Sequence, residues 1–228
     1  MIPIRDTAPC YTRPYVTWGL IFICTALFAF LEYSPDRLHH FVIYIYGMVP
    51  NRYTDPDWAI AMGYPIDYYF TFVSNLFLHG GWWHLIMNMW FLWIFADNIE
   101  DRMGHGRFII FYLLCGIIAT AIQWLHTPSL VVPVVGASGA IAGVLGAYFF
   151  LYPYAKVVIW VPILFLPIFF EVPAIAFIGI WVIFQMSKAT TAMIFYDGAS
   201  DVALWAHLGG FASGFLLFRY FLRKDYPA

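Results

Sequence analysis

The sequence predicts an all-α polytopic membrane protein made of one domain. Of its 228 residues, 63% are hydrophobic and only 11% are charged, and the mean hydropathy is +0.76. In a soluble domain roughly a quarter of the residues are charged, so this composition is typical of a chain that lies mostly in lipid. Six apolar segments follow one another along the chain, and no internal repeat or low-complexity tract indicates a second domain.

Each apolar segment is expected to form a membrane span. A transmembrane helix needs about 17 predominantly apolar residues or slightly fewer inside a bundle. The loop 34–82 is too polar to span, and its aromatic side chains favour the membrane interface. Three prolines interrupt the apolar stretch 153–171, so we expect an interfacial or partly buried connection there, with a seventh, kinked span as the alternative. The predicted spans are 15–33, 83–98, 107–125, 137–152, 172–187 and 203–221.

The positive charges predict a cytoplasmic N-terminus. No small-residue cleavage site follows the first apolar segment, so we interpret it as a retained span. With the N-terminus inside, eight of the 11 Lys and Arg residues fall on the inner side of the membrane, as the positive-inside rule requires. The inner set is Arg5, Arg13, Arg102, Arg107, Lys156, Arg219, Arg223 and Lys224; the outer set is Arg37, Arg52 and Lys188.

Charge and cysteine content restrict the partners. The net charge of −2 offers no basic surface for nucleic acid, and the lipid bilayer is the expected surrounding. Cys10, Cys24 and Cys115 are scattered and match neither a disulfide framework nor a zinc motif. We therefore expect no metal and no cofactor.

A few polar residues occur where the spans should be apolar. In the predicted topology the second, fourth and sixth spans all run from outside to inside. His84 and Asn88 lie near the start of the second, Ser138 near the start of the fourth, and His207 near the start of the sixth. Polar groups inside spans are costly and usually functional. We therefore expect these side chains to share one depth in the outer half of the membrane.

The fourth span is short. Residues 137–152 measure about 24 Å as a helix, against a hydrocarbon core of about 30 Å. The helix is therefore expected to begin below the outer surface, and the loop 126–136 to descend to it. Such a loop is tolerated only where protein or a wet cavity surrounds it. Ser138 would then lie at the bottom of a cavity that water reaches.

Small residues predict that the fourth and sixth spans touch. Surfaces with small residues three or four positions apart allow helix backbones to approach closely. If the two stripes face each other, the hydroxyl of Ser138 and the imidazole of His207 come within hydrogen-bonding distance. The stripes are Ser138, Ala142 and Gly146, flanked by Gly139 and Gly143, and His207, Gly210 and Gly214.

Each of these residues also has a purely structural interpretation. Ser138 can serve helix packing alone, and a histidine at the start of a span often binds a loop carbonyl. We expect His79 and His105 to be histidines of that ordinary kind. Asp197 and Asp201 lie in a loop before His207, where a catalytic role is not expected. A solvated ion cluster at a cytoplasmic helix end is expected of Asp97, Glu100, Asp101 and Arg102, joined by Arg107.

Four motifs together resemble the rhomboid intramembrane serine proteases. They are "GASG" (136–139), "HLIMN" (84–88), "AHLGGFASG" (206–214) and "EDRMGHGRF" (100–108), and the resemblance covers residues ~70 to 220. It implies a six-transmembrane-helix rhomboid-like bundle and a Ser–His dyad that hydrolyses peptide bonds. Ser138 is the implied nucleophile and His207 the implied general base, which takes the proton of an otherwise weakly nucleophilic hydroxyl.

The resemblance also implies an oxyanion hole. His84 and Asn88, four residues apart on one helix face, would form it with the backbone N–H of Ser138. Gly136 would let the loop backbone approach the substrate, and Gly139, Gly210 and Gly214 would serve close helix packing. Ala142 departs from the family, because many relatives carry an aromatic residue there that stacks on the histidine.

The implied substrates are transmembrane proteins cut in or near a membrane-spanning segment. We expect them to enter between the second and fifth spans, because the fifth is short and a flexible segment, 188–200, follows it. A non-catalytic rhomboid-like pseudoprotease that binds membrane clients is the alternative. A transporter or channel is disfavoured by the absence of inverted repeats and mid-span charges. A prokaryotic cytoplasmic membrane is the expected location, and the sequence does not predict an oligomeric state.

Overall fold

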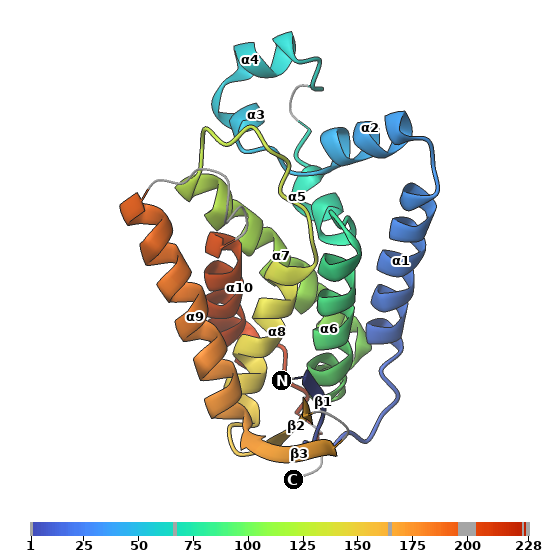
Figure 1. The fold of residues 1–228 in the computed structure, drawn as a ribbon, viewed down its shortest axis with the longest axis vertical. Coiled ribbons are helices and arrows are strands. Elements are labelled where there is room, and N and C mark those ends of the chain that lie inside the picture. Colours follow the sequence, from blue (N-terminus) through green and yellow to red (C-terminus); the bar gives the residue numbers. More distant parts are fainter. Residues whose placement is uncertain (1, 66–67, 164–165, 196–203, 225, 227–228) are drawn as a thin grey trace.

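A computed structural model describes residues 2–65, 68–163, 166–195, 204–224 and 226. Six helices, α1 and α6 to α10, form a bundle; the short helices α2 to α5 gather at one end of it and the strands at the other (Figure 1). The elements are β1 (Ile2–Asp6), α1 (Tyr15–Glu32), α2 (Asp36–Tyr46), α3 (Asn51–Thr54), α4 (Pro56–Ala61), α5 (Thr71–Ser74), the 3-10 helix η1 (Asn75–Phe77), α6 (Trp82–Met103), α7 (His105–His126), α8 (Ser138–Leu151), β2 (Lys156–Ile163), β3 (Leu166–Pro173), α9 (Ala174–Phe195), α10 (Leu204–Leu217) and the 3-10 helix η2 (Phe218–Tyr220).

Each of the six predicted segments overlaps one bundle helix; α1, α8 and α10 lie within their predicted bounds, whereas α6, α7 and α9 extend beyond them. Of these, α1 and α7 are long and apolar enough to cross a membrane by length and composition. The helix α8 and the part 174–187 of α9 are apolar but shorter. The helix α6 carries charged residues in its last turns, which lowers its hydropathy.

The centre of the bundle is α8. All of its residues from Gly139 to Tyr148 are buried, in contact with α6, α7 and α10. A helix that is apolar on every side belongs in a core rather than at a surface, because no face gains from water. The small side chains of this helix explain how three neighbours surround it closely.

The segment before α8 descends into the bundle. It runs from the level of α3 to the start of α8, which lies well below the upper end of α7 (Figure 1). Backbone hydrogen bonds hold it on the way: Val134 forms an antiparallel bridge with Met48, and the Gly136 N–H donates to the Asn75 carbonyl at 2.9 Å. Because these bonds satisfy buried backbone groups, an irregular segment is stable at this depth.

A three-stranded antiparallel sheet closes the other end, so the all-α prediction is wrong for this region. The order is β1-β2-β3, with Ile2 opposite Trp160 and Lys156 opposite Pro173. The stretch 153–171 is therefore not a seventh, kinked span: it is a connection between α8 and α9 that contains β2 and most of β3. Its β-branched and aromatic residues favour strands. Prolines 162 and 167 pair beside the hairpin turn, where a missing N–H is tolerated.

The helix α9 is longer than predicted. It runs for 22 residues from Ala174 to Phe195, so the prediction of a short fifth span with a flexible segment from residue 188 is wrong up to Phe195. Lysine, alanine and methionine in 188–195 favour a helix and outweigh the two threonines. The predicted loop residues Asp197 and Asp201 lie outside the described residues.

The acidic end of α6 is buried, not solvated as predicted. Glu100 is 0% exposed and accepts the N–H groups of Val16 at 2.9 Å and Thr17 at 2.8 Å. These donors belong to the first turn of α1, where a helix favours a negative charge. His105 Nδ1 lies 2.6 Å from the same carboxylate, so this histidine has a specific partner.

Asp101 binds the N-terminal segment in the same way. It is 1% exposed and accepts the N–H groups of Tyr11 and Thr12, each at 2.9 Å. Arg107 does not join this cluster, because its guanidinium donates to the Leu222 carbonyl at 2.8 Å. Glu100 and Asp101 thus fix α1 and the N-terminal segment to the helix that carries His84.

Candidate active site

The structure brings Ser138 and His207 together. Ser138 is the first residue of α8 and His207 lies in the first turn of α10. The distance from His207 Nε2 to Ser138 Oγ is 2.8 Å, within the range of a hydrogen bond between a base and a nucleophile. Both residues are partly exposed, so reagents can reach them.

Glycines set the separation of α8 and α10. A Cβ on Gly210 would collide with the carbonyl oxygen of Gly139 and lie 3.2 Å from the Cβ of Ala142. One turn further along, a Cβ on Gly214 would collide with the backbone of Gly143. The two small-residue stripes therefore face each other, and the absence of side chains at this seam allows the serine and the imidazole to meet.

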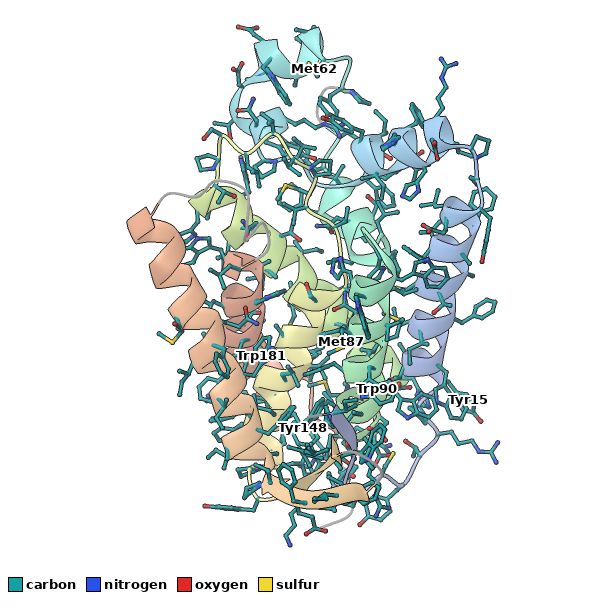
Figure 2. All side chains as sticks on the ribbon, in the orientation of Figure 1. Tyr15, Met62, Met87, Trp90, Tyr148 and Trp181 are labelled. Carbon is teal, nitrogen blue, oxygen red and sulfur yellow. The ribbon has the colours of Figure 1, made fainter. Side chains whose placement is uncertain are left out.

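The other side of the His207 ring faces α9. Its Nδ1 lies 3.1 Å from Oε1 of Gln185, and its centroid lies 6.0 Å from that of Trp181. Trp181 is on the side of α9 that faces α8 and α10 (Figure 2). Sequence reasoning missed Gln185, although a single amide in the apolar run "IGIWVIFQM", four residues after a tryptophan, is a detectable signal.

His84 and Asn88 lie beside the loop that enters α8. A Cβ on Gly136 would lie 2.5 Å from His84 Nε2 and 3.6 Å from Asn88 Nδ2. Gly136 has φ +128°, a conformation that disfavours any side chain, so both its geometry and its surroundings require glycine. The two predicted oxyanion residues therefore flank the backbone two positions before Ser138.

The amide nitrogen Nδ2 of Asn88 has no hydrogen-bond partner among the described residues. The side chain is 7% exposed, and its Nδ2 is buried without an acceptor. Burying an unpaired donor costs about 1–3 kcal/mol, and a ligand that accepts a hydrogen bond from this nitrogen would recover part of that cost. The first N–H groups of α8 also lack helical partners, as at every helix start. The Asn88 amide nitrogen beside Gly136 and the first N–H groups of α8 thus both lie close to the point where the loop enters α8.

His79 is not the interface histidine that the sequence predicts. It is 1% exposed, and its ring packs edge-on against that of His84 with centroids 5.2 Å apart. Burial lowers the pKa of His79 to about 4, with a smaller contribution from His84, so the ring is neutral at physiological pH. A neutral neighbour supports His84 without adding a charge beside the donors.

Comparison with known proteins gives the class of this fold and site. A family model described as "Rhomboid domain" matches residues 67–224, and the chain belongs to the rhomboid family. Its family and its apolar helices identify it as an integral membrane protein.

Several relatives are similar over part of their length. Rhomboid protein 1, mitochondrial, of Saccharomyces cerevisiae is 34% identical over 67% of this chain and 41% of the yeast protein. Putative rhomboid protease YdcA of Bacillus subtilis is 30% identical over 64% of this chain and 63% of that protein. Rhomboid protease GluP of the same bacterium is 30% identical over 59% of this chain and 24% of that protein. The chain therefore covers less than two thirds of each relative's length.

Proposed function

We propose that this protein is an intramembrane serine endopeptidase that uses a dyad of Ser138 and His207. The 2.8 Å contact between the imidazole and the hydroxyl is the observation that carries the proposal. Relatives named as rhomboid proteases support the same reaction class. A protein that only bound membrane clients would have no need of this contact.

The proposed reaction begins with a proton transfer. His207 Nε2 takes the proton of Ser138 as the oxygen attacks the scissile carbonyl carbon. The negative charge that forms on the carbonyl oxygen is stabilised by His84, by the Asn88 amide and by the backbone N–H of Ser138. The imidazolium returns its proton to the leaving amine as the C–N bond breaks, which leaves an acyl-enzyme. Water, deprotonated by the same imidazole, then releases the acid and regenerates the serine.

In this proposal the six bundle helices cross the membrane with the N-terminus on the cytoplasmic side. Arg5, Arg102 and Arg107 then lie at the inner end, together with the sheet. The site lies in the opposite half, where transmembrane substrates are cut near the outer ends of their helices. The relatives come from a bacterium and from mitochondria, so they do not support the prokaryotic cytoplasmic membrane in particular, and that location stays a prediction.

Substrates are proposed to enter between α6 and α9. The two helices touch near the sheet, where the ring centroids of Phe91 and Phe177 are 6.2 Å apart. Toward the other end α9 leans away from α6 (Figure 1). Met87 and Phe184 are exposed on the two helices, at 46% and 64%.

Cross-linking tests this entry route. A bifunctional thiol reagent that links Met87→Cys to Phe184→Cys, in a chain lacking its three natural cysteines, should stop cleavage. Full activity of the linked protein would refute this route.

The test of the function compares three proteins in detergent or bicelles. Wild type, Ser138→Ala and His207→Ala are each incubated with a model single-span substrate, and the products are identified by mass spectrometry. We expect cleavage by the wild type alone. Equal cleavage by all three would reject the dyad, and cleavage by none, with substrate binding retained, would favour the pseudoprotease.

A further inference from the structure

Both ring nitrogens of His207 have partners on different helices. On one side Nε2 lies 2.8 Å from Ser138 Oγ on α8; on the other, Nδ1 lies 3.1 Å from Gln185 Oε1 on α9. Histidine bases in hydrolytic sites commonly have a third group that orients the ring, and in the familiar triads that group is a carboxylate. Here the partner of Nδ1 is an uncharged amide.

We propose that Gln185 is the positioning residue of the dyad, which fixes both the tautomer and the orientation of the His207 ring. This inference rests on the proposed protease function. An amide oxygen only accepts hydrogen bonds, so the proton must be on Nδ1 for this contact to form. The lone pair of Nε2 then points at the hydroxyl of Ser138, which is the arrangement that a general base requires.

The amide suits its surroundings better than an acid. A carboxylate in an apolar helix bundle must be stripped of water, and its desolvation penalty reaches several kcal/mol. A neutral oxygen avoids most of this penalty, yet its dipole still favours the Nδ1–H of the imidazolium that forms during the reaction. Gln185 thus orients the ring without placing a permanent negative charge beside the developing oxyanion.

The helix α9 replaces the support that α8 lacks. Ala142, where many relatives have a stacking aromatic residue, has only a methyl group and packs against Gly210. Trp181 and Gln185 are four residues apart and therefore share one face of α9. Through this face the ring of His207 contacts an indole and an amide together. The Nδ1 side of the imidazole thus contacts α9, while the Nε2 side contacts the nucleophile on α8.

The simpler explanation is that Gln185 only helps α9 to pack against α10. Three substitutions separate the two roles. Gln185→Met keeps the length and shape but has no acceptor of comparable strength. Gln185→Asn keeps the amide but shortens the side chain by one methylene, so that its oxygen falls short of Nδ1. Gln185→Glu keeps an oxygen at the same reach. Ile183→Leu, on a 66% exposed part of the same helix, is the control.

The experiment measures kcat and KM for a single-span substrate, and the ¹⁵N NMR signals of the His207 ring. In the wild type we expect a protonated Nδ1 and an unprotonated Nε2. Gln185→Met and Gln185→Asn should lower kcat by roughly 10–100-fold, the size of loss seen when the hydrogen-bond partner of a metal-bound histidine is removed, with KM almost unchanged. In both, the NMR signals should shift toward the tautomer protonated on Nε2. Gln185→Glu should retain the Nδ1–H tautomer, and Ile183→Leu should retain both the tautomer and the activity.

The outcomes distinguish the two proposals. Full activity and an unchanged tautomer in both Gln185→Met and Gln185→Asn would overturn the role of Gln185, while inactive Ser138→Ala would still support the dyad. Equal cleavage by wild type and Ser138→Ala would instead reject the protease itself. If Gln185→Met does not fold, the activity of Gln185→Asn and the ¹⁵N NMR spectrum of the wild type still test the role of Gln185. A wild-type His207 ring protonated on Nε2 would contradict the inference by itself.

Discussion

Gly143 and Gly214 touch through their backbones: no Cβ fits on Gly214 without colliding with the carbonyl group of Gly143. This contact lies two turns of α10 beyond His207, on the same seam that brings the imidazole to Ser138. The distance of 2.8 Å between the two reactive groups therefore depends on the absence of side chains further along both helices.

Gly214→Ala should separate α8 from α10 and disable the dyad. The added methyl group meets backbone atoms, which cannot rotate away, so the helices must move apart. We expect an overpacking cost of about 1–3 kcal/mol and a large loss of serine reactivity toward a fluorophosphonate. Gly19→Ala on α1 is the matched control, because nothing lies within 4 Å of its Cβ position. Normal labelling of Gly214→Ala would show that the close contact between α8 and α10 does not set the distance between Ser138 and His207.

Two buried asparagines of α6 should give opposite phenotypes. Asn88→Ala removes an amide nitrogen that has no partner among the described residues, so we expect kcat to fall by about 10²–10³ while the melting temperature is preserved. Asn98, which donates to the Ala8 and Pro9 carbonyls at 3.2 and 3.3 Å, is its natural control. Asn98→Ala should lose about 1–2 kcal/mol of stability and keep its kcat. A destabilised Asn88→Ala with normal kcat would contradict the oxyanion role.

Asp6 should make stability depend on pH. Its carboxylate accepts a hydrogen bond from the Tyr148 hydroxyl at 2.5 Å, near the end of α8 beside β1 (Figure 2). Burial raises the pKa of Asp6 to about 6, and the Tyr148 hydrogen bond opposes only part of this effect. The folded state thus disfavours the ionised form, so its stability should fall as the pH rises from about 4 to about 6 and then level off.

The substitution Asp6→Asn tests this dependence. The variant keeps an acceptor for Tyr148 but has no charge, so it should melt at a higher temperature than the wild type at pH 7 and at a similar one at pH 4. The half-buried Asp97 lies close by and is present in both proteins, so the difference between them reports on the removal of the Asp6 charge. Asp36→Asn, at an exposed position, should show no such difference. A melting temperature for Asp6→Asn below that of the wild type at pH 7 would show that the ionised Asp6 does not destabilise the folded state.

The parts of the fold that were predictable follow local patterns. Segment length and hydropathy located the six bundle helices, and the spacing of Gly210 and Gly214 predicted a close helix seam. The same spacing placed His207 opposite Ser138, because residues three and seven positions apart lie on one helix face.

The remaining features depend on partners that are distant in the sequence. The strand β1 has only five residues, and it becomes a strand by pairing with β2, about 150 residues later. From the sequence alone Glu100 is expected at the surface, because its hydrogen-bond donors, the N–H groups of Val16 and Thr17, lie in the distant first turn of α1. Gln185 lies in an apolar run whose sequence does not indicate a distant partner, and its contact with His207 depends on how α9 packs against α10.

The most direct test of the central claim is the reaction of the protein with a fluorophosphonate probe, with the modified residue identified by mass spectrometry. An activated serine reacts with such a probe, whereas an ordinary hydroxyl does not. The account predicts a single adduct on Ser138 in the wild type and its loss in His207→Ala, with Ser213→Ala labelled as well as the wild type. Labelling of Ser138 that is undiminished in His207→Ala would contradict the claim that the imidazole activates this hydroxyl.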